Sequence, residues 1–162
     1  MNEIVKVKRC NFGCGMKEDW LEGYDNVDND DFDFNVFPYP VKDNYYDEIL
    51  TTCVIEHMND IWETLKELHR IMKPNARLII ITAHHNCEPS YNSLQHKCFF
   101  NEMAFKEFII RNPNLFKIEE LKVKPTVLGS FFPEFIRNYL ARHIGHLKGE
   151  ITCIFIKTNQ KA

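Results

Sequence analysis

Residues 5–28 read VKVKRCNFGCGMKEDWLEGYDNVD. The alternation of valine and lysine before Phe12 predicts a strand that runs into a turn made by Gly13, Cys14 and Gly15. Glycine suits such a turn because it accepts positive φ and lets a ligand approach the backbone closely. Asp28 ends a second predicted strand, where its carboxylate can accept hydrogen bonds from ribose hydroxyls. The stretch therefore predicts a nucleotide site, although it lacks the full G-x-G-x-x-G pattern.

The composition is that of an ordinary globular protein. The 162 residues are 44% hydrophobic and 27% charged, so we expect a single domain spanning residues 1–162 with a real core. A net charge of −3 and the lack of a lysine and arginine cluster argue against nucleic acid as a partner. We also expect no stable membrane insertion, because no stretch approaches ~18 continuous apolar residues. A cytoplasmic location is the corresponding expectation. The six cysteines form no C-x-x-C pair, which indicates reduced thiols.

The rest of the chain alternates between strand and helix patterns. Strands are expected at residues 5–12, 24–28, 45–53, 77–82, 116–123 and 150–157. Helices are expected at residues 60–72, opened by Asp60 and Glu63 as a capping box, and at 101–111. A further amphipathic pattern at residues 131–147 predicts a helix that packs on the sheet; the alternative is a lid or a surface that meets a lipid-linked substrate. The order predicts a doubly wound α/β fold with a mostly parallel sheet of about six strands.

Six short blocks carry a family resemblance. In order along the chain they are NFGCG at 11–15, NVD at 26–28, DFNVFPYP at 33–40, YDEI at 46–49, VIEH at 54–57 and LKELHRIMKP at 65–74. In this order they resemble class I S-adenosylmethionine-dependent methyltransferases, and more closely the compact type 11 branch. The resemblance implies a Rossmann-like fold whose last strand is antiparallel, with S-adenosylmethionine as cofactor.

The same resemblance implies a set of cofactor-binding residues. It places Gly13 and Gly15 against the methionine part, Asp28 on the ribose, and Asp33 with Phe34 near the adenine. The full set is Asn11, Gly13, Cys14, Gly15, Asp28, Asp33, Phe34, Thr52, Cys53 and His57. The chain departs from the family because Asn11 replaces the acid that usually ends the first strand. Several helices and one strand are also missing, so we expect a reduced fold whose site binds weakly or depends on a partner subunit or a homodimer.

The implied function is transfer of a methyl group to an oxygen or nitrogen of a small acceptor, such as a sugar or a lipid-linked glycan. A neutral imidazole can remove the acceptor's proton, and the base candidates are His85, then His84 and His96. Two alternatives remain open. The first is a catalytically inactive binding or regulatory subunit with the same fold. The second is a zinc-stabilised interaction module that uses His84, His85, Cys87, His96 and Cys98; in the methyltransferase interpretation we expect no metal.

Overall fold

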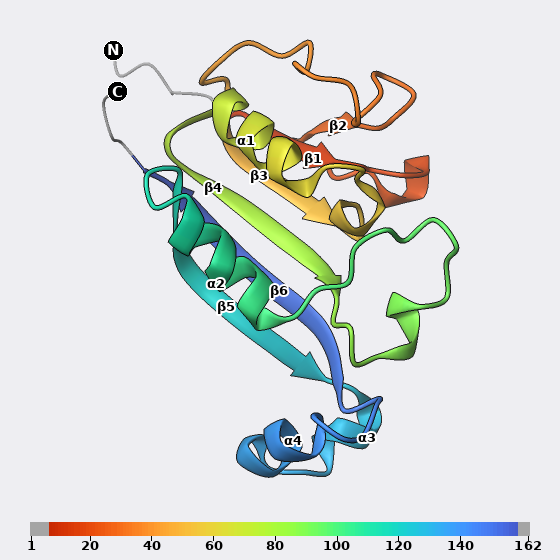
Figure 1. Ribbon diagram of the computed structural model, residues 1–162. Coiled ribbons are helices and arrows are strands. Elements are labelled where there is room, and N and C mark those ends of the chain that lie inside the picture. Colours follow the sequence, from red (N-terminus) through yellow and green to blue (C-terminus); the bar gives the residue numbers. More distant parts are fainter. Residues whose placement is uncertain (1–6, 159–162) are drawn as a thin grey trace.

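A mixed six-stranded sheet organises the computed structural model, which describes residues 7–158 (Figure 1). The strand order is β2-β1-β3-β4-β6-β5. The strands are β1 (Arg9–Phe12), β2 (Asp25–Val27), β3 (Tyr46–Thr52), β4 (Met72–Ala83), β5 (Phe116–Pro125) and β6 (Lys148–Lys157). β6 pairs antiparallel with both β4 and β5, while β2, β1, β3 and β4 pair in parallel. The α/β class, the six strands and the antiparallel last strand are confirmed.

Two helices of ordinary length cover the sheet, α1 (Ile61–Ile71) and α2 (Glu102–Arg111). Asp60 begins α1 as predicted, because its carboxylate accepts from the backbone N–H groups of Trp62 and Glu63. Asn101 caps α2 in the same way. Capping satisfies N–H groups that have no partner inside the helix. Asp60 and Asn101 therefore determine the residue at which each helix begins.

The hydrophobic core lies on one face of the sheet. On this face Phe155 of β6 stacks on Phe116 of β5 at 5.2 Å between ring centroids, and Phe108 of α2 lies 6.2 Å from Phe155. Trp62 of α1 contacts the same Phe108 at 5.1 Å. Both helices therefore cover the same face, as Figure 1 also shows. Over residues 7–158 the opposite face carries no long helix, so the expected reduction of the fold falls on one side of the sheet.

An aromatic loop closes the core beside β1. The ring of Phe34 stacks on Phe12 at 3.9 Å, and Tyr39 lies 5.7 Å from Phe12. Arg70 of α1 fastens this loop, because its guanidinium donates to the carbonyl oxygens of Tyr39 and Val41 at 3.0 and 2.8 Å. The loop at residues 30–40 thus contributes buried side chains to the core.

The prediction of a single helix over residues 131–147 is wrong. The chain instead forms two short helices, α3 (Val127–Ser130) and α4 (Glu134–Leu140), followed by turns. Pro133 separates them, and α4 buries none of its residues. Most apolar side chains of this segment therefore do not pack on the sheet as expected, and Leu147 is its one buried apolar residue.

The largest differences from the predicted strand boundaries are at the starts of β4 and β1. β4 begins directly after α1 at Met72, five residues earlier than expected, with Asn75 at a φ of 63° inside the irregular start of the strand. The predicted first strand began at Val5, which lies outside the described residues, and the strand itself begins at Arg9.

Candidate functional site

A cavity of about 670 Å³ lies where β1, β2 and β3 end. Its size falls in the ordinary range of about 300–1,000 Å³ for small-molecule sites. The carboxyl ends of parallel strands are the usual ligand-binding edge of an open α/β sheet. The lining residues are Gly13, Gly15, Asp28, Asn29, Phe34, Asn35, Cys53, Val54, His57, Met58, Leu94, Gln95 and Lys97.

The turn after β1 forms the floor of this cavity. The backbone N–H groups of Gly13 and Cys14 both donate to the carbonyl oxygen of Val27, at 2.8 and 3.1 Å, which joins the turn to β2. Gly13 has a φ of +78°, and a Cβ there would overlap the Cγ atoms of Val54, one of them at 2.9 Å. Gly15 has a φ of +63°, but a Cβ there would meet only Asp19 Oδ2, at 3.5 Å. Gly13 is therefore required by packing, and Gly15 leaves the backbone open to the cavity.

Asp28 lies at the rim, one residue beyond β2. Its carboxylate accepts from the backbone N–H of Gly15 and from that of Asn29, the latter at 2.6 Å. Asp31 in turn accepts from the backbone N–H of Asp28 at 2.9 Å. Two backbone donors thus hold the Asp28 carboxylate beside Gly15, in a position suited to accepting further hydrogen bonds from a ligand's hydroxyls.

Of the ten predicted cofactor residues, six line this cavity, namely Gly13, Gly15, Asp28, Phe34, Cys53 and His57. Phe34 is only 2% exposed and its ring stacks on Phe12, so it forms a wall from the core side.

The other four predicted residues lie off the cavity. Buried Asn11 donates to Asn26 Oδ1 at 3.0 Å and supports the turn from behind. The Cys14 side chain is buried, and burial raises the pKa of its thiol. Asp33 accepts from the backbone N–H of Asn35 at 2.8 Å and orders the aromatic loop. Thr52 is exposed at the end of β3.

The sequence prediction missed the cavity wall contributed by residues 94–97. The N–H groups of Lys97 and Cys98 donate to the carbonyl oxygen of Glu56 at 2.7 and 3.1 Å, which places this loop across the end of β3. The contact spans about forty residues and involves only backbone atoms, so no side-chain pattern signals it.

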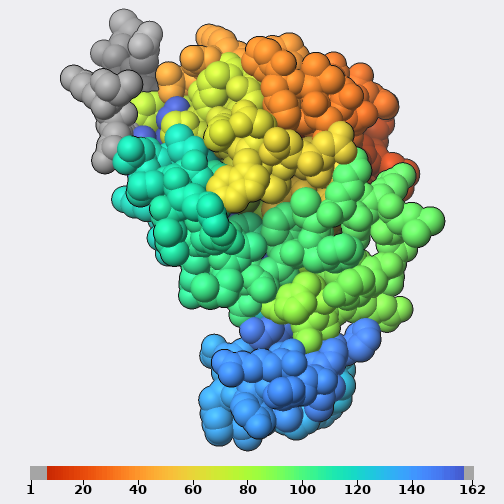
Figure 2. Space-filling view, in the orientation of Figure 1, coloured from red at the N-terminus to blue at the C-terminus, as the bar shows by residue number. Residues whose placement is uncertain are grey.

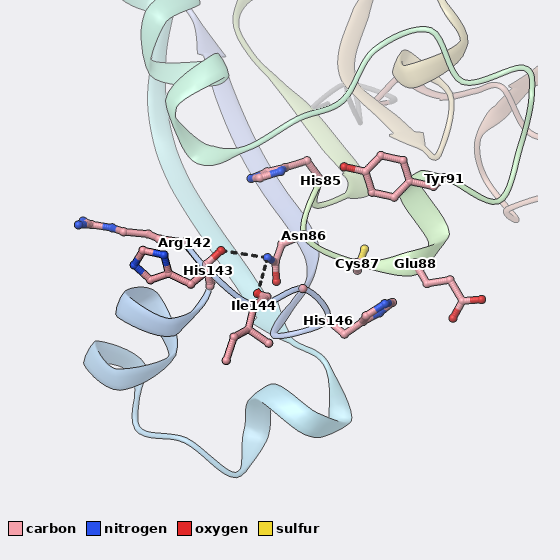
Figure 3. Close-up of a pocket in the computed structure, with 11 residues that line it drawn as sticks. His85, Asn86, Cys87, Glu88, Tyr91, Arg142, His143, Ile144 and His146 are labelled. Atoms are coloured by element: carbon pink, nitrogen blue, oxygen red, sulfur yellow. Dashed lines mark hydrogen bonds between the residues drawn. The ribbon is translucent and has the colours of Figure 1, made fainter.

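A second cavity of about 520 Å³ lies between the loop after β4 and the segment that precedes β6 (Figure 3). Asn86 joins the two loops. Its Nδ2 donates to the carbonyl oxygens of Ala141 and Ile144, and its Oδ1 accepts from the N–H groups of Leu147 and Lys148. The remaining lining residues include His85, Cys87, Glu88, Tyr91, Arg142, His143 and His146.

His84 is held in one tautomer. Its ring is buried, Nδ1 accepts from the backbone N–H of Asn86 at 2.9 Å, and Nε2 lies 3.0 Å from Glu102 Oε2. Since Nδ1 is an acceptor, Nε2 carries the proton and donates to Glu102. Lys148 also contacts Glu102 at 2.5 Å, and the bond to His84 together with that to Lys148 holds the pKa of the Glu102 carboxyl well below its usual range. Both ring nitrogens of His84 are thus occupied.

The other two base candidates have free ring atoms. His85 lines the second cavity, and burial, helped by neighbouring His84, lowers the pKa of its imidazole. His96 Nδ1 lies 2.9 Å from the carbonyl oxygen of Ser90, so Nδ1 donates to this oxygen, and Nε2 has no hydrogen-bond partner among residues 7–158. The His96 ring packs against His57 at 4.7 Å, beside the first cavity. The loop that carries both histidines therefore borders both cavities.

The residues named for a zinc site do not converge. Cys87 Sγ lies 2.9 Å from the carbonyl oxygen of His84, and His84 itself is bonded to Glu102. Within the described part of the chain, no group of three or more histidine, cysteine, aspartate or glutamate side chains is arranged to hold a metal ion.

Part of the chain matches known methyltransferases in sequence. Residues 21–80 match the family described as "Methyltransferase domain". Over 61 residues the chain is 34% identical to a 2-phytyl-1,4-naphtoquinone methyltransferase from Nostoc sp., a match that covers 38% of this chain and 27% of the relative. Over 57 residues it is 39% identical to norajmaline N-methyltransferase from Rauvolfia serpentina, which covers 35% of this chain and 20% of the relative. The matched part of the chain thus spans about a quarter of these relatives' lengths.

Solved structures share the fold. An S-adenosylmethionine-dependent methyltransferase from Archaeoglobus fulgidus superposes with a TM-score of 0.60 at 14% identity, covering 93% of this chain and 86% of that one. A Haloferax volcanii structure in which a methyltransferase activator is bound gives a TM-score of 0.64 at 12% identity, covering 97% and 84%. The family match over residues 21–80 and the shared fold confirm the resemblance to class I S-adenosylmethionine-dependent methyltransferases of the type 11 kind that the sequence shows.

Proposed function

We propose that this chain transfers a methyl group from S-adenosylmethionine to an oxygen or nitrogen atom of a small acceptor. The observation that carries the proposal is the cavity at the ends of β1, β2 and β3, where the Asp28 carboxylate lies beside the open backbone of Gly15. The residues present fit the cofactor: a carboxylate suits two ribose hydroxyls, and a backbone without side chains suits close approach of the methionine part.

The chain's own residues have a limited part in the chemistry. S-adenosylmethionine, when bound, supplies a methyl group on a sulfonium, whose sulfur leaves with the bonding electron pair as a thioether. Asp28 and the glycine turn bind and orient the cofactor. Phe34 and Met58 make the wall of the cavity apolar. Alignment of the acceptor atom with the methyl carbon then supplies most of the rate enhancement.

The second cavity is the proposed acceptor site. Its lining combines side chains that can hydrogen-bond, among them His85, Glu88 and His143, with apolar surface and the exposed aromatic ring of Tyr91. This lining suits a hydroxyl-rich acceptor such as a sugar or a lipid-linked glycan, whereas the two named relatives act on a naphthoquinone and an alkaloid. His85 is the proposed base, because its lowered pKa keeps the imidazole neutral and able to take the acceptor's proton at neutral pH. His96 is the alternative, since its Nε2 is free.

The test is calorimetric titration of the purified chain with S-adenosylmethionine and with S-adenosylhomocysteine. We expect saturable binding that Asp28→Ala abolishes. Asp33→Ala is the matched control, because Asp33 also bonds a backbone N–H nearby but lies off the cavity. Equal loss in both variants, or undiminished binding by Asp28→Ala, would refute the proposed site.

A second candidate is a cofactor-binding subunit that needs a partner for activity. The open face of the sheet favours it, because the chain supplies no helix there over residues 7–158. Methyl transfer to any small hydroxyl or amine acceptor by the isolated chain would eliminate this candidate.

A further inference from the structure

The segment at residues 126–147, here called the α3–α4 lobe, projects from the end of the sheet (Figure 1). In the space-filling view it forms a separate protrusion below the rest of the molecule (Figure 2). Its attachment includes Gly129, which packs so closely on the backbone of Leu147 that no side chain fits there. Gly129 and Leu147 are the two buried residues of the lobe. The lobe is therefore fixed at its base, and the rest of its surface is available for contact.

Large apolar side chains are concentrated on this lobe. The exposed fractions are 82% for Val127, 77% for Phe131, 74% for Phe135 and 63% for Tyr139, and Leu128 and Ile144 are half exposed. Phe135 and Tyr139 are four residues apart on α4, so they share one face of the helix. Clusters of exposed apolar side chains of this kind mark an interaction surface.

A cationic groove of about 500 Å³ adjoins the lobe. Its charged lining consists of five cations, Lys106, Lys122, Lys124, Arg137 and Lys148, and two acids, Glu102 and Glu134. Among the ion pairs of residues 7–158, neither Lys106 nor Arg137 has a carboxylate partner, and Arg137 donates only to backbone carbonyls. Lys122, Lys124 and Lys148 are ion-paired with Glu120, Glu150 and Glu102, so within the described residues Lys106 and Arg137 are the groove's cations without a carboxylate partner.

We propose that the α3–α4 lobe and its adjoining groove dock on an anionic lipid bilayer. Phe131, Phe135 and Tyr139 enter the boundary between headgroups and acyl chains, where aromatic rings are favoured. Lys106, which has no carboxylate partner in the part of the chain that the structure describes, and the exposed Lys122 and Lys124 face the lipid phosphates, whose negative charge attracts basic side chains near the surface. The lobe lies on the membrane and does not cross it: none of the helices within residues 7–158 is long and apolar enough to span a bilayer. The proposed membrane docking does not depend on the proposed methyl transfer.

The test is co-sedimentation of the purified chain with vesicles of phosphatidylcholine alone and with added phosphatidylglycerol. We expect binding to the anionic vesicles that weakens with salt. Phe131→Ser combined with Phe135→Ser is expected to lower the partition coefficient roughly tenfold or more. The matched control is Val36→Ser with Ile110→Ser, which removes two side chains of similar exposure, 61% and 75%, away from the lobe.

Charge is tested separately with Lys106→Gln and Lys122→Gln, which should weaken binding to anionic vesicles and leave any binding to neutral vesicles unchanged. Lys66→Gln on α1 is the charge control, because this lysine is exposed and lies outside the groove. The proposal is overturned if the folded wild-type chain binds neither vesicle. It is also overturned if the lobe variant binds as well as its control, or if light scattering shows a wild-type dimer that Phe131→Ser with Phe135→Ser converts to a monomer.

Discussion

Gly13→Ala tests the packing that places the glycine turn against β3. An alanine at a φ of +78° is strained by about 1–2 kcal/mol, partly offset by a gain of about 0.4–1 kcal/mol because alanine restricts the unfolded chain. The new Cβ would also overlap both Cγ atoms of Val54, and overpacking of this kind costs about 1–3 kcal/mol. We therefore expect the free energy of unfolding to fall by about 2–4 kcal/mol.

The chain contains a matched control for the backbone part of this cost. Gly23 has the same φ of +78°, but a Cβ there would meet nothing within 4 Å. Gly23→Ala should therefore cost only about 1 kcal/mol. The difference between the two variants isolates the overlap with Val54.

Urea unfolding of four proteins, the wild type, Gly13→Ala, Val54→Ala and the double variant, measures that overlap as a coupling energy. In the Val54→Ala background, which lacks both Cγ atoms, Gly13→Ala should lower the free energy of unfolding by about 1–3 kcal/mol less than in the wild type. The reasoning is refuted if Gly13→Ala costs no more than Gly23→Ala, or if its cost is the same with and without the Val54 side chain.

Three further outcomes are expected. Burial, with Lys157 nearby, lowers the pKa of His69 to about 4, so between pH 6.5 and pH 4 the unfolded chain binds a proton that the folded chain does not. Stability should therefore fall on acidification, by about 3 kcal/mol at most, and urea midpoints at pH 7 and pH 5 should show less of this loss in His69→Phe; an equal loss would contradict it. Asn86→Ala removes the four side-chain hydrogen bonds that Asn86 makes to residues 141–148, while the backbone bond from His146 N–H to the Asn86 carbonyl oxygen remains. It should cost about 1–3 kcal/mol, seen as a lower urea midpoint, whereas an unchanged midpoint would show that these four bonds do not stabilise the fold. Finally, His85 should titrate by NMR below its ordinary pKa, and titration at or above that value would remove its basis as a neutral base.

Local signals in the sequence predict much of this fold. The Asp60 cap, the continuous apolar run of β4 and the glycine turn each depend on residues close together in the chain, and the structure contains all three. The segment at residues 131–147 shows where such signals fail. Its apolar spacing satisfies a helical pattern, but Pro133 interrupts the helix and no described part of the chain covers the exposed side chains.

In the candidate site, too, local sequence signals predict some residues and miss others. Gly13, Gly15 and Asp28 lie beside consecutive strand ends, so the order of strands in the sequence places them at one edge of the sheet. The wall at residues 94–97 depends on backbone hydrogen bonds to Glu56, and the Asn86 side chain bonds backbone groups more than fifty residues away. Local sequence patterns record neither contact. Asp33 illustrates the converse: it lies in a family-like block, yet its carboxylate serves a local turn.

The central claim is that S-adenosylmethionine binds at the ends of β1, β2 and β3, and a crystal structure of the chain with S-adenosylhomocysteine tests it most directly. We expect the ligand in the cavity that contains Gly15, with its ribose hydroxyls bonded to the Asp28 carboxylate. Ligand bound elsewhere, for example in the cavity around His85 and Asn86, or a crystal grown at saturating ligand with this cavity empty, would contradict the claim.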